Sequence, residues 1–423
     1  MKREIFFWVL FFLSLGVIWR KPFWGVVFYA AINIIRLEML VWGGTYISKA
    51  YFILFAVILF AAFLNSPKFR VKYALRPPLL FILWLYIALI VSIELSPFEM
   101  ERAYYYANEI FKIFLFCFLI TVLVNDDRKI KRFEDVLLLC IVLLGIWGIQ
   151  QHFRGNTRLE GMGGHAWPDS NGVAAMFVLF FPLAVNKIVI SKDFKTKLLG
   201  IVSTMVVVLL IIFTQSRGGF LALLVCSLYL ILTAKKRVII MLLAVFVILG
   251  AVPFIGKDFK NRMSTMGGMD SMDDSGKSRL ILWQAGLMVF RDNLIFGTGF
   301  LSYPLAKMKY EGNFNYLDPE FRSAVFRIRR PKVTHNTYIQ ILSDGGLFAA
   351  VPLFLLILGT FWKNRVIRKK FPQIEVNQEM YAMLSAIEAG LIGFCVAIMF
   401  MDALTNVFFI VQIIICYNIR GII

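Results

Sequence analysis

Charged residues are scarce in this sequence, and the residue types that usually carry metal or redox chemistry are few. Lys, Arg, Asp and Glu make up 17% of the 423 residues, and the chain has only three histidines and five cysteines. No two cysteines form a C-x-x-C pair, and all five lie in apolar blocks, where we expect them to pack as small hydrophobic side chains. The sequence therefore predicts no redox site, no metal site and no bound cofactor.

Apolar residues predominate in the sequence. Hydrophobic residues account for 60% of the chain and the mean hydropathy is +0.75, well above the usual composition of soluble domains. The apolar residues recur in blocks of about 15 to 20, near the length at which a helix crosses a bilayer. Lipid offers backbone groups no hydrogen-bond partner, so such blocks must be helices or closed barrels. We predict an all-α, polytopic transmembrane bundle of about 12 spans.

The apolar blocks suggest twelve or thirteen helices, and the uncertainty lies at the N-terminus. Lys2 and Arg3 precede an apolar run to Trp19 without an A-x-A-like cleavage site, which indicates an uncleaved first helix. Only Arg20 and Lys21 separate that helix from the next, so the orientation of the N-terminus stays open. The predicted spans are 4–19, 22–36, 50–65, 79–95, 109–124, 135–150, 171–190, 198–214, 218–233, 238–255, 336–361, 381–401 and 404–419.

Basic residues are divided unevenly between the two sets of short loops. One set (66–78, 125–135, 191–197, 234–237 and 362–372) carries 19 Lys and Arg, whereas the alternate set carries 4. Cytoplasmic loops retain Lys and Arg, so the richer set is predicted to face the cytoplasm. The formal charge of +19 is then a matter of topology, and we expect no nucleic-acid partner.

One long connection divides the chain into three parts. We predict N-terminal transmembrane helices over 1–255, a long periplasmic loop over 256–335 and C-terminal transmembrane helices over 336–423. The loop contains an apolar helical segment, Ser278–Phe290, predicted to lie at the membrane interface or to cap the bundle.

Three outward-facing segments hold the residues that could carry chemistry. The tight turn at 215–219 places Arg217 at the outer membrane boundary; alternatively, Arg217 only extends its charge to lipid headgroups. Arg279 opens the loop helix, where an N-terminus favours anions; alternatively, it is a solvated loop residue. His335 lies where the loop re-enters the membrane, and its structural alternative is a hydrogen-bonded interface histidine.

These three side chains form a plausible set for group transfer. Arginines bind phosphate bidentately and could hold a departing pyrophosphate. A histidine can take a proton from an attacking hydroxyl, a contribution of typically ~10² to 10⁴ in rate. Asp344 lies nine residues after His335, which places it about half a turn away around a helix. We therefore do not expect Asp344 to orient the histidine, and we predict a packing or turn role for it.

The segments carrying these residues resemble those of the O-antigen ligase superfamily, which includes lipopolysaccharide O-antigen ligases, O-antigen polymerases and protein O-oligosaccharyltransferases. The resemblance rests on Ser216-Arg217-Gly218-Gly219, on the stretch from Ser278-Arg279 to Gly299, and on His335-Asn336-Thr337-Tyr338 through Gly346. It implies metal-independent, inverting transfer of a glycan from an undecaprenyl-pyrophosphate donor to an acceptor hydroxyl at the periplasmic face. Carried over by position, Arg217, Arg279 and Asn336 bind substrate and His335 is the general base.

The acceptor is left open by these motifs: lipid A core, a growing glycan or a protein. The segment from Gly163 to Asn171 also resembles ligases associated with exosortase systems, which suggests a narrower subgroup.

A transporter or flippase of lipid-linked sugars is the main alternative, and a scaffold protein is a third. A transporter is expected to show repeated halves and midplane ionisable residues. No repeat is visible, and Glu109, Lys112 and Glu388 are predicted to lie nearer the ends of their spans.

Overall fold

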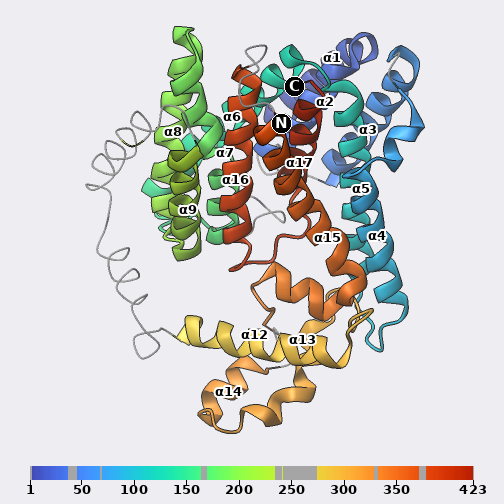
Figure 1. Cartoon of the computed structure of the whole chain (residues 1–423), viewed down its shortest axis with the longest axis vertical. Helices are drawn as coiled ribbons and strands as arrows, with labels where there is room; N and C mark the ends of the chain where they lie inside the picture. Colours follow the sequence, from blue (N-terminus) through green and yellow to red (C-terminus); the bar gives the residue numbers. More distant parts are fainter. Residues whose placement is uncertain are drawn as a thin grey trace.

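The computed structural model describes residues 2–36, 45–66, 69–162, 169–233, 241, 274–327, 332–370 and 378–422. Every regular element in these ranges is a helix, so the predicted all-α class is confirmed (Figure 1). The helices are α1 (Lys2–Arg20), α2 (Pro22–Ile35), α3 (Thr45–Asn65), the 3-10 helix η2 (Val71–Leu75), α4 (Leu79–Glu94), α5 (Ala103–Leu123), α6 (Asp127–Phe153), α7 (Ser170–Ile190), α8 (Phe194–Thr214), α9 (Arg217–Thr233), α12 (Asp274–Asp292), α13 (Tyr303–Ala306), the 3-10 helix η4 (Lys307–Phe314), α14 (Pro319–Val325), α15 (Thr337–Lys370), α16 (Gln378–Ala397) and α17 (Val407–Arg420).

The described helices agree with the predicted membrane spans. Six of them, α5, α6, α7, α8, α15 and α16, are long and apolar enough to cross a bilayer. Shorter apolar helices coincide with the predicted spans in α1, α2, α3, α4, α9 and α17. The predicted span at 238–255 lies almost wholly outside the described residues, so the choice between twelve and thirteen spans stays a prediction.

Helix α7 lies at the centre of the bundle, where it packs against α8 and α16. Glycines bring these helices close together. A Cβ built on Gly390 of α16 would lie 2.2 Å from the carbonyl oxygen of Leu179, and one on Gly200 of α8 would lie 2.8 Å from that of Ala184. Small residues are common at such crossings, because dispersion contacts take over in lipid from the hydrophobic effect that drives association in water.

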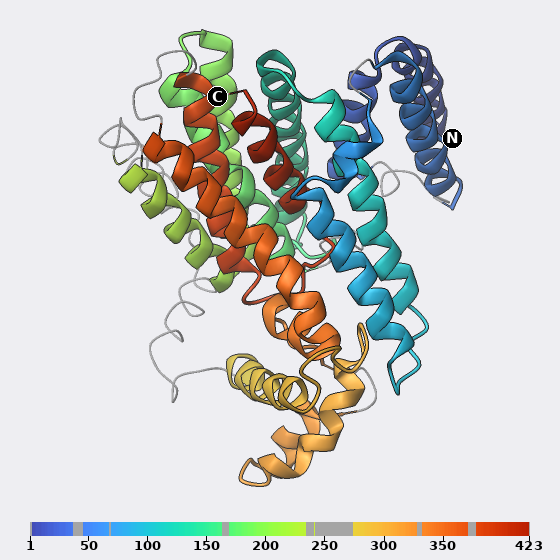
Figure 2. The ribbon, with the colours of Figure 1, turned by 45° about the vertical axis from the view of Figure 1, so that its right-hand side comes forward.

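A second, smaller layer covers one end of the bundle. Helix α12 lies across that end, with α13 beside it and α14 beyond it (Figures 1 and 2). This layer has its own core, which includes Leu282, Tyr303, Phe314 and Phe326. The helical segment predicted at 278–290 is therefore present within α12 and caps the bundle as expected.

Buried hydrogen bonds join this layer to the bundle at Asp344. The carboxylate accepts backbone N–H groups of Leu301 and Tyr303, at 2.9 Å each, and a hydrogen bond from the Gln340 amide. The hydroxyl of Ser92 in α4 donates to the Asp344 carbonyl at 2.6 Å. Asp344 therefore serves in packing, in agreement with the prediction from its phase.

Two ionisable residues lie nearer the middle of their helices than predicted: Lys112, the tenth of the 21 residues of α5, and Glu388 in α16. Glu388 is near the middle of α16, where its carboxylate pairs with Arg368 of α15 at 2.6 Å and accepts the Tyr229 hydroxyl of α9 at 2.6 Å. The prediction of a position near the span end was wrong: Glu388 is only three residues from the midpoint of the predicted span 381–401, and it lies at the middle of α16, which runs from Gln378 to Ala397. The pairing with Arg368 partly neutralises the buried charge.

Candidate active site

The turn that carries Arg217 is docked onto the beginning of α7. Helix α8 ends at Thr214, Gln215 adopts a left-handed conformation with φ of 51°, and α9 begins at Arg217 itself. The hydroxyl of Ser216 accepts the Gly219 N–H at 3.0 Å and contacts the side-chain oxygen of Asn171 at 2.7 Å. Arg217 is thus fixed at the end of the bundle covered by α12.

Glycine at position 219 is required by this docking. A Cβ built there would lie 2.3 Å from the Cβ of Ala174 in α7, a distance that side chains do not tolerate. The glycine therefore allows α9 to begin directly against α7, and the position of Arg217 follows from that contact.

Arg279 lies on α12, slightly further into the helix than predicted. The helix begins at Asp274, so Arg279 falls in its second turn. Trp283 lies four residues later on the same face. Its indole Nε1 donates to the carbonyl oxygen of Thr334 at 3.0 Å, which ties the Arg279 face of α12 to the segment preceding His335.

The start of α15 fixes the backbone around His335. Asn336 is 4% exposed, and its side-chain oxygen accepts the N–H groups of Tyr338 and Ile339 at 3.0 and 3.1 Å as a helix cap. The Thr337 hydroxyl donates to the carbonyl oxygen of Met401 at 2.8 Å. His335 has a left-handed backbone, with φ of 51°, which is uncommon outside glycine. Asn336 was predicted to bind substrate, and that stays a prediction; the two cap bonds show in addition that Asn336 fixes the backbone beside His335.

The electrostatic surroundings of His335 show which charged groups lie near it. Burial lowers the pKa of its imidazole to about 4, and the positive charge of Arg279 lowers it further, whereas the carboxylate of Asp169 acts in the opposite direction. Charge interactions of this kind need proximity. The structure therefore brings His335, Arg279 and the N-terminal end of α7 to one region.

An aromatic pair connects the Arg217 turn to the same region. A Cβ on Gly218, next to Arg217, would lie 3.0 Å from the ring of Phe400. The Phe400 ring centroid is 6.3 Å from that of Trp283. Since Trp283 also bonds the residue before His335, the segments of all three predicted site residues meet around Phe400 and Trp283.

Two carboxylates near His335 were not among the predicted site residues. Asp402 lies in the connection between α16 and α17, and the Thr334 hydroxyl is 3.4 Å from its Oδ1. Desolvation by the surrounding protein raises the pKa of its carboxyl to about 7, although part of the residue reaches solvent. Asp169 caps α7 by accepting the Gly172 N–H at 2.7 Å. The signal in the sequence was weak: Asp402 is a lone acidic residue in a short turn between two apolar blocks.

The site combines two fixed cations, a neutral imidazole and nearby carboxylates. Within the described ranges, no group of three or more His, Cys, Asp or Glu side chains is arranged to hold a metal ion. The arrangement is suited to anion binding together with proton transfer.

Comparison with known proteins gives one family match. A model described as O-antigen ligase matches residues 201–354, the region that contains Arg217, Arg279 and His335. No curated protein matches the chain.

Proposed function

We propose that this chain, whose residues 201–354 match the O-antigen ligase family model and support membership of that superfamily, is a glycosyltransferase that moves a glycan from an undecaprenyl-pyrophosphate carrier to an acceptor hydroxyl. In this proposal His335 is the general base, and Arg217 and Arg279 bind the donor pyrophosphate. Asn336 holds the His335 backbone through its cap of α15. The acceptor is a glycolipid, a glycan or a protein.

The proposed reaction is a single displacement. The acceptor hydroxyl loses its proton to the imidazole as its oxygen forms a bond to the anomeric carbon. The bond from that carbon to the pyrophosphate oxygen breaks on the opposite side, which inverts the configuration. The electron pair leaves with the polyprenyl pyrophosphate, whose growing negative charge the two guanidinium groups stabilise.

The observation that carries the proposal is the 3.0 Å hydrogen bond from Trp283 to the Thr334 carbonyl oxygen, which holds the Arg279 face of α12 against the segment before His335. Burial and the positive charge of Arg279 hold the imidazole neutral at physiological pH. A neutral imidazole can accept a proton, whereas an imidazolium cannot. The Arg279 guanidinium, which helps to keep the His335 imidazole neutral, can also bind the departing pyrophosphate.

The face of the membrane follows from the distribution of basic residues. The 3-10 helix η2, the start of α6, the connection from α7 to α8 and the last turns of α15 carry many of these basic residues, and they lie at the end of the bundle opposite α12–α14 (Figure 1). Since basic loops remain cytoplasmic, we assign the site to the periplasmic face of a bacterial inner membrane.

A purified-protein assay tests the proposal. The full chain in detergent, incubated with lipid-linked donor and a candidate acceptor, is expected to give glycosylated product. Because detergent leaves no second compartment, product formation requires an enzyme and excludes transport as the sole activity. Arg217→Ala, Arg279→Ala and His335→Ala are each expected to abolish transfer in folded protein. Equal product from the His335→Ala protein removes that residue from the mechanism.

A further inference from the structure

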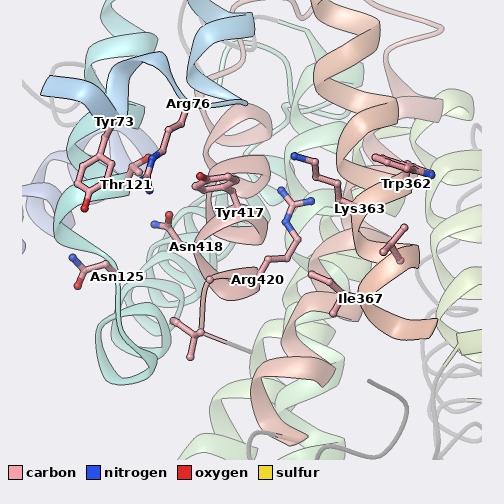
Figure 3. A pocket seen from close by; sticks show the side chains of 13 residues that line it. Tyr73, Arg76, Thr121, Asn125, Trp362, Lys363, Ile367, Tyr417, Asn418 and Arg420 are labelled. Carbon is pink, nitrogen blue, oxygen red and sulfur yellow. The ribbon is translucent and has the colours of Figure 1, made fainter. Parts of the chain in front are cut away.

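A cavity of about 700 Å³ lies at the end of the bundle opposite the candidate active site. It is formed where η2, the end of α5, the last turns of α15 and the end of α17 come together (Figure 3). The proposed glycan transfer makes no use of it.

Three cationic side chains line this cavity: Arg76, Lys363 and Arg420. No Asp or Glu is among the lining residues, and within the described part of the chain none of the three forms an ion pair with a carboxylate. Figure 3 shows the Lys363 ammonium and the Arg420 guanidinium directed toward the same space. Like charges held together without an anion repel one another, so this cavity is suited to a negatively charged ligand.

Two of these cations are held in place by the protein. The Arg76 guanidinium carbon lies 4.4 Å from the centroid of the Tyr73 ring, a distance at which the ring face attracts a cation. Arg420 lies 3.4 Å from both the Thr360 carbonyl oxygen and the Asn364 side-chain oxygen. Guanidinium groups fixed in this way match phosphate oxygens in pairs.

An apolar track leads from the lipid-facing side of α15 to the cavity. Leu347, Val351, Leu355, Leu358 and Trp362 recur at helical spacing, and each is between 37% and 65% exposed. Trp362 both ends the track and lines the cavity. Tryptophan at such a position is typical of the membrane interface, where headgroups and acyl chains meet.

We propose that this cavity binds the phosphate headgroup of an anionic glycerophospholipid, with its acyl chains along the α15 track. Charge complementarity favours a headgroup with a net negative charge over a neutral or zwitterionic headgroup. The continuity of cavity and track favours a lipid over free phosphate as the source of that anion. Basic pockets between helices on the cytoplasmic side are a recurrent form of lipid site, and the distribution of basic loops predicts that leaflet here.

Native mass spectrometry of the full chain in detergent tests the proposal, with phosphatidylglycerol and phosphatidylcholine titrated in parallel. The wild type is expected to bind phosphatidylglycerol at least about tenfold more tightly than phosphatidylcholine, because each basic residue near a lipid surface strengthens anion binding severalfold. The variant Arg76→Gln/Lys363→Gln is expected to lose that preference. Neither side chain makes a hydrogen bond within the described residues, so the variant is expected to fold normally.

A matched control removes the same charge from the same end of the protein. Arg365 and Lys369 are exposed on α15 and do not line the cavity, so Arg365→Gln/Lys369→Gln is expected to bind phosphatidylglycerol within about twofold of the wild type. If both variants lose phosphatidylglycerol affinity equally, the attraction comes from the overall positive charge of this end of the protein, and the proposal of a specific site is overturned. Binding of inorganic phosphate or glycerol 3-phosphate as tight as that of the lipid overturns the lipid assignment. Glycan transfer is measured separately, so failure of either proposal is recognised independently of the other.

Discussion

The indole Nε1 of Trp283 donates a 3.0 Å hydrogen bond to the carbonyl oxygen of Thr334, the residue that precedes His335. This bond joins the layer above the membrane to the point where the chain re-enters the bundle. Arg279 lies one helical turn before Trp283, so the bond sets the distance between the predicted anion-binding group and the predicted base.

Replacing Trp283 by phenylalanine keeps an aromatic ring but removes the donor. Thr334 is fully buried, so its carbonyl oxygen would lose a partner that water cannot replace, at a cost of about 1 to 3 kcal/mol. We expect Trp283→Phe to lower kcat for transfer with little change in the KM for donor, because His335 shifts while the arginines remain. Trp19→Phe, at a 48% exposed position, serves as control and is expected to change neither constant. A wild-type kcat for Trp283→Phe contradicts the positioning role.

The pKa of His335 is open to direct measurement. Burial and Arg279 place it at about 4, below the ordinary histidine value of about 6.5. The stability that this group contributes is therefore complete above about pH 6.5 and is lost as the pH falls toward 4. With only three histidines in the chain, NMR of ring-labelled protein can follow each titration. Arg279→Gln is expected to raise the His335 pKa, and Arg279→Lys, which keeps the charge, is expected to leave it low.

The same pKa determines the pH dependence of transfer. The acid limb of kcat/KM, which reports the free enzyme, is expected well below pH 6.5. A bound pyrophosphate adds negative charge near the imidazole and raises its pKa, so the acid limb of kcat is expected at higher pH than that of kcat/KM. If the kcat/KM limb lies at or above pH 6.5 while NMR places His335 near 4, another group is the base.

Glycine 219 offers a test of the Arg217 turn that leaves the arginine unchanged. In Gly219→Ala the new methyl group meets Ala174 of α7, and overpacking of this kind costs typically about 1 to 3 kcal/mol. We expect a lower midpoint of thermal unfolding in detergent and slower transfer, because the start of α9 must move. Gly16→Ala, where a Cβ meets nothing within 4 Å, is expected to match the wild type. Unchanged transfer in Gly219→Ala would show that the position of Arg217 is not critical.

Asp344 provides a test of the junction between the two layers. Asparagine can replace only one of the two carboxylate oxygens that accept the Leu301 and Tyr303 N–H groups, so a buried donor is left without a partner at a cost of about 1 to 3 kcal/mol. We expect Asp344→Asn to loosen the layer formed by α12–α14, which limited proteolysis within 293–327 would detect as faster cleavage. Glu101→Gln, an exposed change in another loop at this end, is the control. Equal cleavage of both variants would mean that Asp344 is not needed to hold the layer.

Composition and periodicity were sufficient to predict the membrane bundle. In lipid, backbone groups must bond within their own segment, so each apolar block dictates a helix independently of its neighbours. The predicted spans from 4–19 to 218–233 and from 336–361 to 404–419 therefore coincide with helices, and the capping segment in the long connection was recognised from its apolar residues. The predicted site residues were likewise selected from their residue types and their place at span boundaries.

What the tertiary structure decided is which of these residues meet. Asp402 lies more than sixty residues after His335, and only the packing of α15 against the α16–α17 connection brings them together through Thr334 and Thr337. The basic cavity is similar, because Arg76 and Lys363 lie in two loops that were predicted only as cytoplasmic, and Arg420 follows the last predicted span. Asn336, predicted to bind substrate, is in addition the cap of α15; that second role was not visible in the sequence, because a side chain's partners depend on the surrounding structure. The local sequence determines each helix, whereas long-range packing determines the chemistry between helices.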